Sequence, residues 1–116
     1  MSKKRYFIIA KCYDKQQRVI GVGINSYTKT HPLQKYFAEK VGHGEKECLH
    51  AEIAAILRCK QKVIHRITVE RYNSLGHPAN AKPCPICQEA IKAFGIKLVE
   101  FSDVDGFSQY VPKKHP

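Results

Sequence analysis

Runs of apolar residues with the spacing of strands open the chain. Residues 6–13 are rich in β-branched and aromatic side chains, and after a polar break the apolar run 19–24 follows. Two such runs in succession predict a β-hairpin. Gly21 and Gly23 lie inside the second run, where glycine indicates a bulge or a close approach of another backbone.

Three later segments have the spacing of helices. Residues 32–41 begin with Pro32, which is well tolerated in the first turn of a helix. Residues 48–59 place leucine and isoleucine side chains along one face, with alanines between them. Residues 85–94 form a third amphipathic segment, and Gly95 is expected to end it.

The remaining apolar runs predict three more strands. They cover residues 64–72, 96–101 and 107–111, and the polar residues 73–82 form a loop. The order β-β-α-α-β-α-β-β predicts an α/β fold with three layers, α/β/α, around a mixed five-stranded sheet. The last two strands are joined by the short turn 103–106, so we expect an antiparallel C-terminal pair.

Size and hydropathy restrict the class of protein. The chain has 116 residues, which suits a single domain over residues 1–116. The mean hydropathy is −0.40, and no apolar run approaches the roughly 20 residues of a membrane-spanning helix. The N-terminal residues do not have the apolar core of a signal peptide, so we expect a cytoplasmic protein without a membrane partner.

The chain is strongly basic. Twenty Lys and Arg residues against ten Asp and Glu residues give a formal net charge of +10. Such a balance favours phosphate-bearing partners, either nucleotides or nucleic acid, although basic surfaces also serve solubility alone. The charges are scattered over residues 3–5, 58–66 and 113–114.

Cysteine and histidine provide the candidate chemistry. Five cysteines without a secretion signal argue against a disulfide framework and favour metal ligation. Cys84 and Cys87 form a Cys-x-x-Cys pair at the start of a predicted helix, and His50 lies near the start of another. Taken singly, these could be a redox pair, buried thiols or a helix cap. Together they give three ligands, the number that a catalytic zinc site uses.

Glu52 follows His50 by two residues. This position allows the carboxylate to reach a water on the metal without ligating the metal itself. Zinc lowers the pKa of such a water to about 7, and Glu52 could pass the proton to a leaving nitrogen. Three metal ligands and this carboxylate together are suited to hydrolytic removal of an amino group from an sp² carbon.

The segments His50-Ala51-Glu52 and Pro83-Cys84-Pro85-Ile86-Cys87 match the His-x-Glu and Pro-Cys-x-x-Cys signature of zinc nucleobase deaminases. The chain therefore resembles the cytidine and deoxycytidylate deaminase superfamily, and residues 80–84 resemble its phage and microbial members. The resemblance implies Zn²⁺ held by His50, Cys84 and Cys87, with Glu52 as the catalytic proton shuttle.

The resemblance also implies substrate contacts. Asn25, at the end of the second strand, would bind the sugar, and the carbonyl near Ala51 and the N–H of Cys84 would touch the reacting centre. The loop that follows Asn25 would border the pocket through Tyr27, Lys29 and His31. For Asn25 the alternative is a residue that closes the strand, and for the loop residues it is a scaffolding role.

Three functions remain open. The first is zinc-dependent deamination of cytosine in a cytidine or deoxycytidine nucleoside or nucleotide. The second, suggested by the net charge, is deamination of cytosine or adenine within single-stranded DNA or RNA. The third is a metal-stabilised binding module without turnover, against which Glu52 argues. By its resemblance the chain is expected to form a homo-oligomer.

The resemblance does not select one branch of the superfamily. Residues 80–84 resemble loosely characterised members, whereas an antiparallel terminal strand pair resembles the cytidine deaminase branch rather than the deoxycytidylate and transfer-RNA branch. Cys12, Cys48 and Cys59 are expected to be core thiols. A second metal site formed by Cys48 with His43 and His77 is a minor alternative.

Overall fold

The computed structural model describes residues 6–42 and 48–112. Within them the chain forms the strands and helices β1 (Phe7–Tyr13), β2 (Val19–Ile24), α1 (Pro32–Lys40), α2 (Ala51–Arg58), β3 (Arg66–Tyr72), β4 (Pro78–Ala79), α3 (Pro85–Ala93), β5 (Leu98–Asp103) and β6 (Gly106–Tyr110). The predicted order of elements is confirmed. The additional strand, β4, lies inside the segment expected to be a loop.

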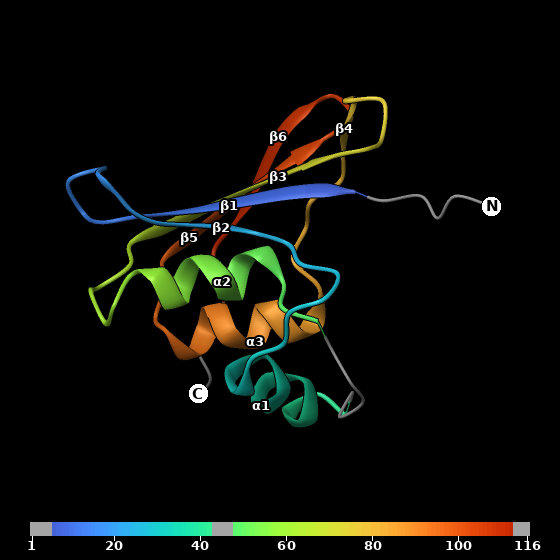
Figure 1. The fold of residues 1–116 in the computed structure, drawn as a ribbon. Coiled ribbons are helices and arrows are strands. Elements are labelled where there is room, and N and C mark those ends of the chain that lie inside the picture. Colours follow the sequence, from blue (N-terminus) through green and yellow to red (C-terminus); the bar gives the residue numbers. More distant parts are fainter. Residues whose placement is uncertain (1–5, 43–47, 113–116) are drawn as a thin grey trace.

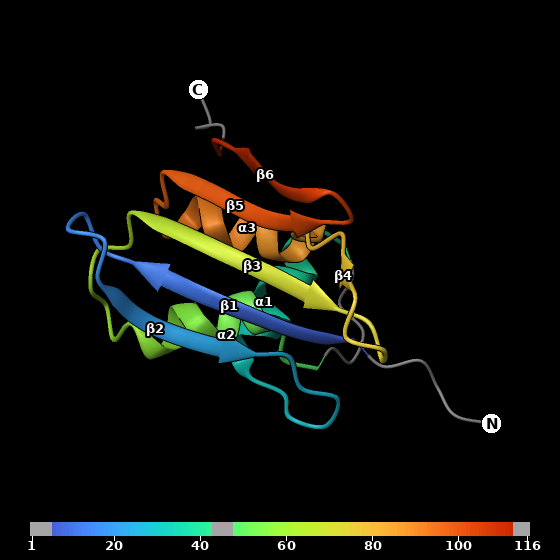
Figure 2. The ribbon, with the colours of Figure 1, turned by 90° about the horizontal axis from the view of Figure 1, so that it is seen from above.

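All strands belong to one mixed sheet with the order β2-β1-β3-β5-β6, and β4 pairs with β3 at one end (Figure 2). The pairing of β3 with β5 is parallel, and α3 makes the connection between them. The pair β5 and β6 is antiparallel, with Asp103 opposite Gly106. The short turn had predicted this arrangement, and it is confirmed.

The three helices stack on one side of the sheet (Figure 1). Helix α2 packs on β1 and β2, and α1 packs on α3. The expected α/β class and the three layers are present. The first layer is the sheet, the second is the pair α2 and α3, and the third is α1, so the helices do not lie on both faces of the sheet (Figure 1). The strands alternate, so that Ala10, Ile67 and Val99 are fully buried toward the helices. Lys11 and Thr68 pair on the opposite face, which also carries the exposed side chain of Val22 and is covered by none of the three helices (Figure 1).

The two glycines of β2 allow α2 to lie directly on the strand. A Cβ atom on Gly21 would come within 2.5 Å of the carbonyl oxygen of Ala55, and one on Gly23 would overlap the backbone of Ala51 and Ala55. Of the two alternatives predicted from these glycines, a bulge or a close backbone approach, the structure shows the close approach. It fixes the position of the first turn of α2, which follows His50.

The three cysteines outside the Cys-x-x-Cys pair differ in burial. Cys12 and Cys59 are buried in the core as expected, whereas Cys48 is only partly buried and lines a cavity.

Within the described residues, no helix is long and apolar enough to cross a membrane.

Candidate metal centre and substrate cavity

Two helix N-termini carry the candidate metal ligands. His50 is the N-cap residue of α2, and Cys84 is the N-cap residue of α3. Neither side chain makes the usual capping hydrogen bond to its own helix. Both helices begin at the same end of the molecule (Figure 1). The two side chains are therefore directed toward each other instead of toward their own helix termini.

The third ligand, Cys87, lies one turn into α3 and is fully buried. Its Sγ is 3.3 Å from Nδ1 of His50, and Sγ of Cys84 is 3.5 Å from the same nitrogen. All three ligand atoms lie within 4.8 Å of one another. A tetrahedral zinc ion with usual bond lengths places nitrogen and sulfur ligands about 3.5 Å apart. The donor atoms and their spacing thus fit Zn²⁺ with one position left for water or substrate.

The two thiols have different acidities. Hydrogen bonds from Cys87 and then His50 lower the pKa of Cys84 to about 4. The pKa of Cys87 is raised, first because its proton is shared with Cys84 and next because it is buried. Without metal, the pair therefore holds one thiolate, at Cys84. Zinc binding requires both sulfurs as thiolates and so releases a proton.

Glu52 lies beside this triad but is not part of it. It is the second residue of α2, its exposure is 6%, and it lines the same cavity as His50 and Cys84. Burial raises its pKa, and the neighbouring imidazole of His50 acts in the opposite direction. A buried carboxyl group next to a metal site, with a raised pKa, is suited to accept and return a proton near neutral pH.

The triad opens into a cavity of about 450 Å³. This volume lies in the range of small-molecule sites. The residues that line it come from the start of β1 and the residue before it, from the segment after β2, from the start of α2 and the residues before it, from β3 and from the segment before α3: Tyr6, Ile8, Asn25, Ser26, Tyr27, Cys48, Leu49, His50, Glu52, Val69, Arg71, Ala81, Lys82 and Cys84.

Two of the expected substrate residues line this cavity. The Asn25 side chain accepts a hydrogen bond from the N–H of Ile8 at 3.0 Å and donates one to the carbonyl of Tyr6 at 3.1 Å. The Tyr27 hydroxyl donates to the same carbonyl at 2.8 Å. Both side chains hold the start of β1 against the end of β2, and both also face the cavity.

The other expected substrate residues lie elsewhere. Nδ1 of His31 accepts from the N–H of Leu33 and so caps α1, and His31 lines a different cavity. Lys29 is held by backbone hydrogen bonding, because its carbonyl accepts from the N–H of Leu49. Ala51 is fully buried, and its carbonyl is directed at the backbone of Gly23. Lys29, His31 and Ala51 are thus not among the residues that line this cavity, and their contact with substrate stays a prediction.

Some residues at the site were missed in the sequence. Gln34 of α1 is fully buried, and its Oε1 accepts a hydrogen bond from the backbone N–H of His50 at 3.0 Å. Arg71 of β3 lines the cavity. A glutamine on the buried face of an amphipathic helix could have been identified from the residue spacing, but its hydrogen-bond partner could not. Among the described residues Cys48 and His77 form no metal cluster, and His43 lies outside them.

The fold and the site together define a zinc hydrolase with an αβ scaffold. The family model described as "Cytidine and deoxycytidylate deaminase zinc-binding region" matches residues 3–103. The chain belongs to this family, and its activity is that of a deaminase. The crystal structure of cytidine deaminase from Mycobacterium leprae is similar, with 15% sequence identity and a TM-score of 0.53, over 90% of this chain and 75% of that chain. No significant match to a curated protein was found.

Proposed function

We propose that the protein hydrolytically deaminates cytosine in a cytidine or deoxycytidine nucleoside or nucleotide. The observation that carries this proposal is the buried carboxyl group of Glu52 beside three metal ligands that leave one position open. A binding module without turnover would not need this carboxyl group. The similarity to a cytidine deaminase supports cytosine as the base.

The roles of the residues follow from their placement. His50, Cys84 and Cys87 hold the zinc ion, which when bound supplies the Lewis acidity that makes a water nucleophilic near neutral pH. Glu52 accepts the proton from the attacking water and delivers a proton to the exocyclic nitrogen, which leaves as ammonia. Its burial keeps bulk water away from this transfer.

Asn25 and Tyr27 are the proposed contacts of the sugar. Both line the wall of the cavity, and the hydrogen bonds to Tyr6 hold them in place. A second copy of the chain as partner and a cytoplasmic location remain predictions. A single-stranded polynucleotide is the alternative substrate, because a net charge of +10 favours binding of a phosphate backbone.

The experiment is a substrate panel of cytidine, deoxycytidine, their 5′-monophosphates, and single-stranded DNA and RNA containing cytosine or adenine. Conversion is read by mass spectrometry as the exchange of an amino group for oxygen, together with release of ammonia. We expect conversion of mononucleosides or mononucleotides with a shallow salt dependence. Faster conversion of the polynucleotides, with a steep loss as salt rises, would select the alternative.

A further inference from the structure

Arg71 brings a positive charge into the cavity at the carboxyl end of β3. Side chains two positions apart on a strand lie on the same face, and Val69 and Arg71 both line the cavity. Arg71 is therefore on the helix-facing side of the sheet, on which α2 and α3 begin. Its backbone is fixed there because its N–H donates to the Ser102 hydroxyl at 2.9 Å.

The guanidinium of Arg71 is oriented but not neutralised. It lies over the ring of Tyr6, with 3.8 Å between its Cζ and the ring centroid. One Nη donates a long hydrogen bond, 3.4 Å, to the carbonyl of Asn80, and the buried Nε has no acceptor among the described residues. Stacking on a ring leaves the N–H groups in the guanidinium plane directed outward. Nε itself is buried, so the second Nη, which has no hydrogen-bond partner among the described residues, is the donor that an acceptor such as phosphate can reach.

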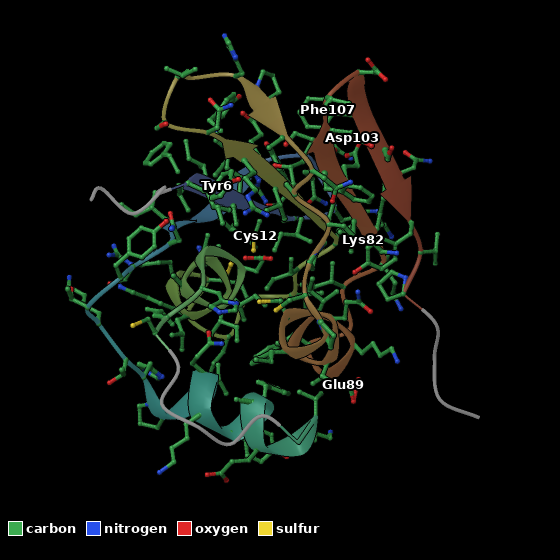
Figure 3. All side chains as sticks on the ribbon, turned by 90° about the vertical axis from the view of Figure 1, so that its right-hand side faces the viewer. Tyr6, Cys12, Lys82, Glu89, Asp103 and Phe107 are labelled. Carbon is green, nitrogen blue, oxygen red and sulfur yellow. The ribbon has the colours of Figure 1, made fainter. Side chains whose placement is uncertain are left out.

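A second cation borders this cavity. Lys82 lines the same cavity, is exposed, and precedes Cys84 by two residues, which is a separation of at most about 7 Å along the backbone. Lys82 forms no ion pair with another described residue. Among the described lining residues Glu52 is the only carboxylate, and it belongs to the metal centre. Figure 3 shows Tyr6 and Lys82 on the side of the molecule where α2 and α3 begin.

Arg66 on the same strand provides a contrast. Its guanidinium also stacks on a tyrosine, Tyr13, at 3.9 Å. In this case Nη1 is paired with Glu100 at 2.6 Å and the other Nη donates to Gln17. Arg66 does not line the substrate cavity. The strand thus carries one stacked arginine whose charge is paired within the protein and one whose charge faces the cavity.

We propose that Arg71, assisted by Lys82, binds the 5′-phosphate monoester of a nucleoside monophosphate and so sets the specificity of the site for nucleotides over nucleosides. This inference rests on the proposed function. Tyr6 joins the two parts of the site, because its ring stacks on Arg71 and its carbonyl accepts from Asn25 and Tyr27. The proposed sugar contacts and the proposed phosphate contacts are therefore neighbours.

A cavity with two cations fits a single phosphate group better than the repeated phosphates of a polynucleotide, for which a longer positive track is typical. The phosphate monoester also carries more charge than a phosphodiester, which favours Arg71 and Lys82 as a pair. A single-stranded polynucleotide is accordingly an outcome of the test and not part of the proposal.

Equilibrium binding tests the proposal without turnover. The Glu52→Gln protein, loaded with zinc, is titrated with cytidine, cytidine 5′-monophosphate, their deoxy forms and single-stranded oligonucleotides containing cytosine. We expect the monophosphates to bind at least tenfold more tightly than the nucleosides. Adding Arg71→Gln should remove this advantage, a loss of roughly 10- to 150-fold for the monophosphates, and weaken nucleoside binding much less. Arg71→Lys, which keeps the charge without the planar fork, should retain part of it.

Arg66→Gln is the matched control and should leave the preference for the monophosphate intact. Zinc content and the thermal midpoint of each variant show that the fold is preserved. Equal binding of nucleoside and monophosphate, or an equal loss for both in Arg71→Gln, would overturn the proposal. If the oligonucleotide bound more tightly than the monophosphates, and if Arg71→Gln abolished that tighter binding, the proposal would also be overturned. If the protein deaminated nucleosides and monophosphates equally well, the proposed function would hold and only the phosphate-binding role of Arg71 would be rejected.

Discussion

Oε1 of Gln34 accepts a hydrogen bond from the backbone N–H of His50 at 3.0 Å, so the outermost helix holds the first metal ligand in place. Gln34 is fully buried, although α1 has no contact with the metal group itself. Helix α1 packs on α3, which carries the two cysteine ligands. One side chain thus connects α1 to the start of α2 beside the metal centre.

Gln34→Leu is expected to weaken zinc binding. The substitution leaves the N–H of His50 without its acceptor, and loss of an outer contact to a metal ligand typically costs 10–100-fold in affinity. The affinity is measured by competition with a chromogenic chelator. The exposed Gln109 on β6 provides the control variant Gln109→Leu, which should bind zinc normally. Equal affinities in both variants would show that Gln34 does not position His50.

Removal of zinc is expected to destabilise the fold. The ligand triad connects the starts of α2 and α3, so metal bound to the native state adds to its stability. At a free zinc concentration a thousand times the dissociation constant, this contribution is about 4 kcal/mol. Cys84→Ser should lower zinc content and the thermal midpoint together. Cys48→Ser, which changes a cavity residue outside the triad, should keep its zinc. A chelator without effect on the midpoint would contradict this coupling.

Gly23→Ala is expected to be strongly destabilising. The added methyl group would overlap the backbone of Ala51 and Ala55, which cannot move without displacing α2. Overpacking of this kind costs about 3 kcal/mol. Gly76→Ala is the comparison, because Gly76 has a φ of 81° but open space around it. Its cost should be about 1–2 kcal/mol, from backbone conformation alone. Urea denaturation measures both, and similar losses would show that the close packing of β2 on α2 is not limiting.

The thiols are expected to differ in alkylation. The pKa of Cys84 is lowered to about 4, first by the hydrogen bond with Cys87, so Cys84 is a thiolate at pH 6. The pKa of Cys12 is raised by burial and then by Cys59, so Cys12 stays a thiol through neutral pH. Iodoacetamide at pH 6 should therefore modify Cys84 first in the metal-free folded protein, and zinc should protect it. The sites are mapped by mass spectrometry, and equal labelling of Cys12 would contradict the prediction.

Local patterns in the sequence predicted much of the fold. The bounds of β2 are those of its apolar run, and Gly21 and Gly23 indicated the close packing on α2 before the partner was known. The antiparallel end of the sheet followed from the length of one turn. These features depend on neighbouring residues, whose spacing can be read directly.

Features that depend on distant segments were harder to predict. The metal ligands were found because their chemical types and spacing are specific, although Cys84 follows His50 by 34 residues. The partner of Gln34 could not be identified in this way, because no residue type or spacing in the sequence marks the N–H group that the Gln34 side chain accepts from. The sequence also did not show that the loop after Asn25 folds back on the Ser26 side chain, which accepts from the N–H of Lys29, so that Lys29 and His31 do not line the cavity. The layer order depends on which face of the sheet the helices cover, and the uncovered face also carries apolar side chains such as Val22 and Ile24.

The most direct test of the central claim compares wild-type protein with Glu52→Gln for two quantities in the same samples, bound zinc per chain and the rate of ammonia release from cytosine nucleosides and nucleotides. The account predicts one zinc ion per chain in both proteins and a loss of activity of roughly 10²- to 10⁴-fold in the variant, since proton transfer typically contributes this much. Undiminished ammonia release by a zinc-loaded Glu52→Gln protein would contradict it.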